Sequence, residues 1–340
     1  MKKQERYPID FVIPWVDGSD PEWLKERNYY AEQEGIPSVI DNSDTRFRDW
    51  DTLKYLFRSI EMYTPWVRKI HFITCGHLPE WMNPEAEKLH IVRHSDYMPE
   101  EYLPTFSSHA IELNIHRIKG LADHFVYFND DILVLKPLKR TDFFKNGLPR
   151  DYALLNVISS SHRGSVMDTA LTDIEVINDH FSKNHVIKSN IGKWINPVYG
   201  KALFRTFLLM PWPRFVNLYG THTSNAFLKS TFSKVWAEEE ELLHSTSLHK
   251  FRTRRDANQW LMREWQLCEG SFIPMSPGNG RLLSIKNDNT DIIGAIQKKK
   301  YRIVCVNDNG AEEIRDFDKV YSELEAVMKQ AFPRKSSFEK

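Results

Sequence analysis

The sequence lacks the features that mark secreted, membrane-spanning and disulfide-rich proteins. Its 340 residues contain only three cysteines, Cys75, Cys268 and Cys305, and their odd number and wide spacing predict neither a disulfide framework nor a zinc site. We interpret all three as buried thiols. No stretch reaches the roughly 18 apolar residues of a spanning helix, and residues 1–10 are charged rather than apolar. We therefore expect a cytoplasmic protein.

Charge of one sign and glycine-rich phosphate loops are also missing. Lys plus Arg and Asp plus Glu both number 46, so no basic field predicts nucleic-acid binding. The sequence has no P-loop, no Gly-x-Gly-x-x-Gly motif and no serine or cysteine nucleophile motif. Hydrophobic residues make up 41% and charged residues 27% of the chain, which is typical of a globular protein with a sizeable core.

Strand and helix patterns alternate along the first part of the chain. Strands are predicted at residues 9–16, 69–74 and 125–128, and helices at residues 52–62 and 108–118. This alternation predicts an α/β, Rossmann-like fold with a largely parallel sheet. In such folds the ligands bind beyond the carboxyl ends of the strands.

The later part of the chain is less regular. Helical patterns cover residues 224–243, 256–267 and 318–330, a last strand covers 301–306, and residues 190–200 and 334–340 are expected to be a loop and a frayed tail. Pro211 and Pro213 exclude a continuous helix there, and we interpret the apolar residues 204–212 as core rather than as an interface. The predicted division is an α/β part (1–145), a part that completes the same domain (146–310) and a C-terminal helix with a tail (311–340).

Polar residues follow two of the predicted strands. Asn129, Asp130 and Asp131 come directly after a buried strand, and Asn307 and Asp308 follow the last one. Adjacent carboxylates at such a position favour a hard divalent cation such as Mg²⁺, which commonly bridges carboxylates and phosphates. Taken singly, each cluster is more typical of a solvated or Asx-type turn.

A segment near residue 240 is rich in groups that act on hydroxyls and phosphates. Its members are His222, His244, His249, Arg252, Arg254, Arg255 and Asp256. An imidazole can accept a hydroxyl proton near neutral pH, and a guanidinium can bind phosphate oxygens in a bidentate manner. The alternative is a solvated helical face. Arg58 could likewise bind a diphosphate or form a salt bridge, and Trp15 could stack on a base or lie in the core.

Taken together, these motifs resemble the Stealth family of sugar-1-phosphate transferases. The matching blocks are residues 9–20, residues 56–61 with 65–70, residues 103–112 with 127–131, residues 222–252, and residues 305–309. They occur in the family's order and span most of the chain. The family includes bacterial polysaccharide phosphotransferases and the animal N-acetylglucosamine-1-phosphotransferase of lysosomal enzymes.

The resemblance implies a glycosyltransferase-A-like sheet flanked by helices, with a helical acceptor-side region. It implies transfer of a hexose 1-phosphate from a nucleotide-sugar, typically UDP-linked, to a hydroxyl of a glycan or lipid-linked oligosaccharide, with release of a nucleoside monophosphate. It also implies Mg²⁺ or Mn²⁺ as cofactor and a peripheral position at the inner membrane face. A metal-dependent glycosyltransferase and an inactive glycan- or nucleotide-binding protein are the alternatives.

The resemblance also assigns roles to individual residues. His222 matches the general base, Arg252 a phosphate-binding arginine, and Asp130, Asp131 and Asn307 the metal ligands. The donor-binding positions are Trp15, Val16, Asp17, Arg58, Glu112, His116, Arg117, Asn129 and His249.

Overall fold

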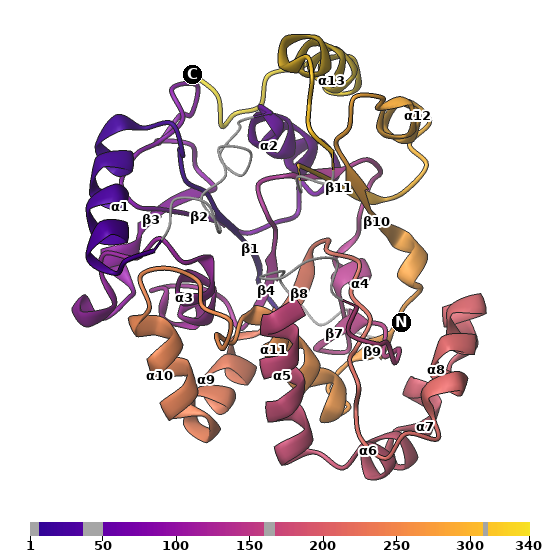
Figure 1. The fold of residues 1–340 in the computed structure, drawn as a ribbon. Coiled ribbons are helices and arrows are strands. Elements are labelled where there is room, and N and C mark those ends of the chain that lie inside the picture. The colour runs from indigo at the N-terminus through magenta and orange to yellow at the C-terminus, as the bar shows by residue number, and fades with distance from the viewer. Residues whose placement is uncertain (1–6, 37–49, 160–166, 309–311) are drawn as a thin grey trace.

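The computed structural model describes residues 7–36, 50–159, 167–308 and 312–340. A five-stranded sheet in the order β3-β2-β1-β4-β8 lies at its centre (Figure 1). Its strands are β1 (Ile9–Pro14), β2 (Ile70–Thr74), β3 (Leu89–Arg93), β4 (His124–Tyr127) and β8 (Asn225–Leu228). The first four run parallel to one another, and β8 pairs with β4 in the antiparallel direction.

Two smaller sheets extend this centre. One has the order β10-β11-β5 and consists of β5 (Ile132–Val134), β10 (Gly280–Ser284) and β11 (Ile303–Asn307). The other has the order β6-β7-β9 and consists of β6 (Phe144–Lys145), β7 (Leu148–Asp151) and β9 (Ile273–Pro274). Because only four residues separate β4 from β5, the turn between them connects the central sheet to the β11 sheet.

The central sheet separates two hydrophobic cores. Alternate residues of a strand point to opposite faces, and accordingly Phe11 and Ile13 lie in one core while Val12 lies in the other. The first core contains helices α2 (Thr52–Tyr63), α12 (Thr290–Gln297) and α13 (Phe317–Ala331). The second contains α3 (Ser108–Leu113), α5 (Met167–His180), α9 (Lys229–Glu238), α10 (Glu240–Leu248) and α11 (Gln259–Cys268).

The remaining helices are α1 (Pro21–Gln33), α4 (Arg140–Phe143), α6 (Lys183–Ser189), α7 (Ile191–Trp194) and α8 (Leu203–Leu209). Helices α6, α7 and α8 also contribute buried residues to the second core. Helix α1 starts after the N-cap Asp20, whose Oδ1 accepts the Trp23 N–H at 2.8 Å, and Pro21 occupies the first helical position. Helices α6, α7 and α8 form an extension at the lower right of Figure 1, on the opposite side from α1. Within the described ranges, no helix has the length and apolarity needed to span a bilayer.

The predicted α/β class with a largely parallel, Rossmann-like sheet is confirmed. Several details are wrong. Strand β8 occupies the start of the predicted helix 224–243, and helix α7 lies in the predicted loop 190–200. Strand β8 is only four residues long, and the helical pattern that follows it masks its signal. The domain boundaries stay a prediction, although α13 packs in the same core as β1 and α2.

The C-terminal tail is ordered, which corrects the expectation of fraying. Phe338 is only 3% exposed and its ring lies 5.1 Å from that of Phe57. The Lys340 N–H donates to the Trp81 carbonyl at 2.9 Å. A second correction concerns the thiols: Cys268 and Cys305 are buried as expected, but Cys75 is exposed.

Candidate active site

The site forms where β1, β4 and β11 end at one edge of the sheets. Phe128 continues the pairing of β4 by donating to the Val12 carbonyl, and the chain then turns, with the Ile132 N–H donating to the Asn129 carbonyl at 3.3 Å. The Asp131 carbonyl accepts the Val306 N–H at 2.8 Å. This pairing places the Asp131 side chain beside the end of β11.

Asp131 has one bonded oxygen and one that lacks a partner. Its Oδ2 accepts the Asn307 amide at 2.7 Å and the Cys305 thiol at 3.1 Å, whereas its buried Oδ1 has no hydrogen-bond partner among the residues that the structure describes. Burial raises the pKa of the Cys305 thiol, and the Asp131 charge raises it further. Cys305 therefore stays protonated and acts as a donor to Asp131. A buried carboxylate oxygen without a partner is costly and points to a missing cation or donor.

His222 reaches this carboxylate from a distant part of the sequence. The β4–β8 register pairs Tyr127 with Asn225, so the residues just before β8 lie at the edge where β4 ends. The Asn129 amide nitrogen is 3.4 Å from His222 Nε2. Ligand atoms of Asp131, His222 and Cys305 all lie within 4.8 Å of one another.

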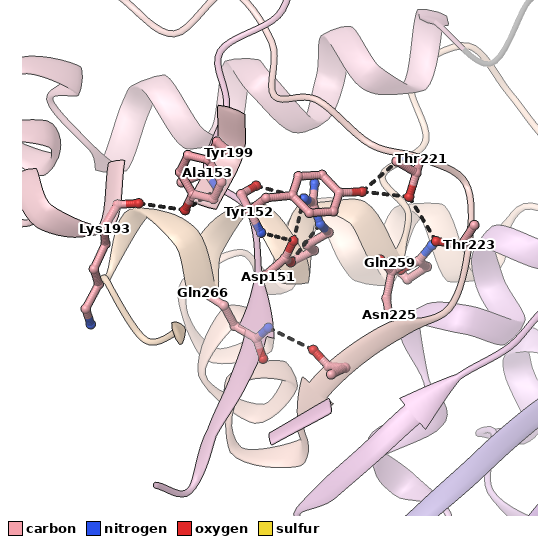
Figure 2. Close-up of polar contacts among 12 residues, drawn as sticks. Asp151, Tyr152, Ala153, Lys193, Tyr199, Thr221, Thr223, Asn225, Gln259 and Gln266 are labelled. Carbon is pink, nitrogen blue, oxygen red and sulfur yellow. Dashed lines mark hydrogen bonds and ion pairs between the residues drawn. The ribbon is translucent and has the colours of Figure 1, made fainter. Parts of the chain in front are cut away.

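The backbone of His222 is in the left-handed region, with φ of 51°. This conformation costs a non-glycine residue about 1–2 kcal/mol, so neighbouring contacts must maintain it. The Thr221 N–H donates to Tyr152 Oη at 3.0 Å, and Tyr152 Oη lies 2.7 Å from Thr221 Oγ1. Thr221 Oγ1 lies 2.9 Å from Thr223 Oγ1 (Figure 2). The residues on both sides of His222 are thus fixed through Tyr152.

The Tyr152 ring in turn packs against a buried ion pair between Arg263 and Asp151. Arg263 Nε and Nη2 donate to the two carboxylate oxygens of Asp151 at 2.8 and 2.7 Å, and the guanidinium carbon is 4.9 Å from the Tyr152 ring centroid. Gly280 also approaches the loop: a Cβ there would lie 2.8 Å from Thr223 Oγ1. A hollow beside Thr223 is lined in part by Ser276 and Gly280.

Arg252 and His249 lie on a second loop, between α10 and α11. Asp256 is fully buried beneath this loop and accepts hydrogen bonds from His249 at 2.8 Å, His109 at 3.1 Å and the Thr253 hydroxyl at 2.6 Å. The exposed Arg252 donates to Ser108 Oγ at 2.7 Å, which ties the loop to α3. His249 is therefore an anchor of the loop, and Arg252 is the group presented to solvent.

The Tyr127 hydroxyl, at the end of β4, donates to Glu112 Oε1 at 3.0 Å. Burial raises the pKa of Tyr127 well above its usual range, and the charges of Glu112 and Asp130 add to this, while the Arg252 charge opposes it. Glu112, Asp130 and Arg252 therefore all act on one hydroxyl at the end of β4.

The predicted donor loop at the end of β1 contacts the end of β2. The Trp15 ring stacks on Phe72 with a centroid distance of 5.8 Å and meets the His77 ring edge-on at 5.2 Å. The Asp17 N–H donates to His77 Nε2 at 2.7 Å, and Val16 between them is half-buried. His77 was not among the predicted site residues, although it lies just after a predicted strand, where ligand-binding residues are expected.

Three predicted donor-binding residues make their contacts elsewhere. Arg58 forms a bidentate ion pair with Glu339, at 2.9 and 2.7 Å, and donates to the Phe332 carbonyl. Arg117 lies over the Trp236 ring of α9 at 4.7 Å, and the His116 ring is 5.9 Å from that of Trp236. Burial lowers the pKa of His116 to about 4. These contacts hold the tail and α9 in place and give no support to donor binding, which stays a prediction for these three.

The residues at the sheet edge fit a hard divalent cation. The test is the Asp131 carboxylate, whose buried Oδ1 has no hydrogen-bond partner among the described residues, together with the adjacent Asn307 amide. Carboxylate and amide oxygens suit Mg²⁺ or Mn²⁺, and a protonated thiol is not a metal ligand. The His222 imidazole lies beside this pair. Asp130 lies close enough for its charge to act on Tyr127 and Cys305.

Two family models match the chain. Stealth protein conserved region 1 matches residues 7–35, and conserved region 2 matches residues 46–151. The first region includes Trp15 and Asp17, and the second includes the turn from Asn129 to Asp131.

Relatives match over nearly the whole chain. A capsular polysaccharide phosphotransferase WcwK from Streptococcus pneumoniae is 39% identical over 340 residues, covering 100% of both chains. A receptor polysaccharide phosphotransferase WefC from Streptococcus oralis is 36% identical, covering 97% of this chain and 99% of its own. The exopolysaccharide phosphotransferase cps2G from Lactiplantibacillus plantarum is 36% identical, covering 98% of this chain and 97% of its own. The chain belongs to the Stealth family of polysaccharide phosphotransferases.

Solved structures resemble the fold only distantly. The galactosyltransferase LgtC, in complex with donor and acceptor sugar analogs, covers 96% of each chain at 10% identity with a TM-score of 0.40. The glycosyltransferase GlyE of Streptococcus pneumoniae TIGR4 covers 98% of this chain and 64% of its own at 9% identity with a TM-score of 0.36.

Proposed function

We propose that this protein transfers a hexose 1-phosphate from a nucleotide-sugar, with UDP as the expected nucleotide, to a hydroxyl of a surface polysaccharide under synthesis. The products are a phosphodiester and a nucleoside monophosphate. The observation that carries the proposal is the convergence of His222 with Asp131 and Asn307, from three distant segments, at one sheet edge. The phosphotransferase names of the full-length relatives support the type of reaction.

In this proposal each residue has one task. His222 removes the proton from the acceptor hydroxyl, whose oxygen attacks the phosphorus bonded to the sugar 1-oxygen. The bond between that phosphorus and the bridging oxygen of the nucleoside phosphate breaks, and the nucleoside monophosphate leaves with the electron pair. Arg252 binds phosphate oxygens as charge develops on them, and the donor's base lies near Trp15.

Asp131 and Asn307, with Asp130 close by, are the residues that would hold Mg²⁺ or Mn²⁺. When bound, such an ion neutralises charge on the donor's phosphates. The hollow beside Thr223 borders the His222 loop, and we place the acceptor sugar there.

The deciding experiment identifies the nucleotide that is released. The purified protein is incubated with Mg²⁺, a panel of nucleotide-sugars and an acceptor oligosaccharide extract, with and without EDTA. Metal-dependent release of a nucleoside monophosphate, matched by a phosphodiester in the product, is the expected result. Release of a nucleoside diphosphate would mean glycosyl transfer instead, and saturable donor binding without any release would favour a binding protein.

The metal site has a separate test. Asp131→Asn keeps the size of the side chain but removes its charge, so we expect it to abolish the Mg²⁺ dependence of donor binding in calorimetry. Asp316→Asn is the matched control, because Asp316 caps helix α13, where its Oδ1 accepts the Lys319 N–H at 3.0 Å. Unchanged Mg²⁺-dependent affinity in the Asp131 variant would remove Asp131 from the metal site.

A further inference from the structure

An apolar surface lies on the extension formed by α7 and α8. Phe204 is 68% exposed, Leu208 58%, Trp212 54% and Phe207 52%. Ile191 and Val198, from α7 and the turn after it, are exposed as well. We call these six side chains the 191–212 face. It contains half of the large exposed apolar side chains in the described residues, and it corrects the expectation that residues 204–212 lie in the core.

The 191–212 face is held in place from its inner side. Thr206 is fully buried and its hydroxyl accepts the Leu155 N–H at 3.1 Å. The buried Lys183 ammonium donates to the carbonyls of Leu209 at 3.0 Å, Met210 at 2.9 Å and Trp212. These bonds satisfy carbonyls at the C-terminal end of α8. The apolar side chains are therefore presented outward by a fixed segment.

The segment that carries the 191–212 face has charged side chains of one sign only. Residues 181–214 contain the six basic residues Lys183, Lys188, Lys193, Lys201, Arg205 and Arg214, and no Asp or Glu. The whole chain, in contrast, balances 46 basic against 46 acidic residues. Lys188, Lys201 and Arg214 are exposed, so positive charge borders the apolar side chains.

We propose that the 191–212 face binds the surface of a membrane that contains anionic lipids. Aromatic and leucine side chains can enter the boundary between headgroups and acyl chains, while Lys and Arg bind the lipid phosphates. A second copy of this chain is a poorer occupant, because a symmetric contact would bring two basic segments together. Figure 1 shows the extension projecting from the body of the molecule, where it can meet a flat surface.

The test is cosedimentation of the whole protein with vesicles. One set consists of phosphatidylcholine alone, and the other also contains phosphatidylglycerol. We expect clear binding to the anionic vesicles, weakened by salt, and little binding to the neutral ones. Combining Phe204→Ser, Phe207→Ser and Leu208→Ser is expected to weaken binding at least about 100-fold, because each apolar side chain that enters the membrane contributes to the free energy of binding.

Charge is tested separately with Lys188→Gln, Lys201→Gln and Arg214→Gln, each expected to weaken binding about fivefold. Tyr29→Ser on α1 is the control, because Tyr29 is 58% exposed but lies far from the extension. Thermal unfolding of every variant checks the fold.

Equal binding to neutral and anionic vesicles, or no binding at all, would overturn the proposal. Self-association in sedimentation that the triple serine variant abolishes, without vesicle binding, would instead make the face a contact between copies. Vesicle binding is measured without donor or acceptor, so its outcome does not depend on the proposed reaction.

Discussion

The two loops that carry His222 and Arg252 are built in similar ways but differ in what anchors them. Each lies over a buried aspartate, Asp151 beneath the first and Asp256 beneath the second. Asp151 pairs with Arg263, whose guanidinium keeps its charge at every pH in use. Asp256 pairs with two imidazoles, which are charged only when protonated, and with Thr253.

Because the anchors differ, we expect His222 to be held rigidly and Arg252 to be able to adjust its position. His222 sits in a left-handed backbone conformation fixed on both sides through Tyr152. Arg252 is exposed and held by one hydrogen bond to Ser108. A general base must be placed within a fraction of an ångström of its proton, whereas an arginine can close on phosphate after the donor binds.

The largest expected effect tests the first loop directly. His222→Gln removes the proton acceptor but keeps a polar side chain, so we expect the rate of transfer to fall by about 10²–10⁴ with donor affinity nearly unchanged. Steady-state kinetics and donor calorimetry measure the two quantities. His244→Gln is the control, because His244 bonds to Tyr102 outside the site. More than half of the original activity in the His222 variant would contradict its role.

A smaller effect tests the support of that loop. Tyr152→Phe removes the hydroxyl that fixes Thr221, and we expect kcat to fall roughly 10–100-fold with the donor KM unchanged, because His222 moves. Tyr199→Phe is matched to it: Tyr199 also loses two bonds, to Lys193 and Ala153, but does not touch the loop (Figure 2).

A purely structural role for Tyr152 would give equal losses of activity and of melting temperature in both variants. Thr221→Ser keeps the hydroxyl that contacts Tyr152 and should therefore keep the transfer activity. Thr221→Val removes this hydroxyl and should lose activity.

The second loop should respond to acid. Burial by itself would raise the pKa of Asp256, but the bonds from His109 and Thr253 outweigh it and lower the pKa below 3.8. Its ionised form therefore contributes stability that is fully present above pH 3.8 and is lost as the pH falls below that value. We expect amide protection in residues 249–256, measured by hydrogen exchange, to decline over this range. Unchanged protection of these residues well below pH 3.8 would contradict the anchoring role of Asp256.

The smallest effect on activity is expected at Arg58. Arg58→Met breaks a largely buried pair with Glu339, which should cost about 3 kcal/mol of unfolding free energy and leave donor affinity unchanged. Denaturant unfolding and donor calorimetry measure both, and Glu339→Gln should show the same pattern. If the Arg58 variant lost donor affinity without losing unfolding free energy, Arg58 would be a donor-binding residue.

Much of the fold could be predicted because its signals are local. Continuous apolar, β-rich runs identified β1, β2 and β4, and a helical apolar pattern identified α2. The polar residues after β4 and β11 were identified as the ends of strands. Short elements such as β8 and α7 carry too few residues for a pattern to emerge. The exposure of Phe204 and the order of the tail at Phe338 depend on partners far away in the sequence.

The sequence by itself determined the α/β alternation, the positions of the strand ends and the candidate residues His222, Arg252, Asp131 and Asn307. Only the tertiary structure decided that Asp131 meets Asn307 and His222, that Tyr152 supports the His222 loop, and that Arg58 holds the tail. The physical reason is that an apolar pattern specifies which side of an element is buried. It does not specify which distant polar groups come together once several such elements have packed.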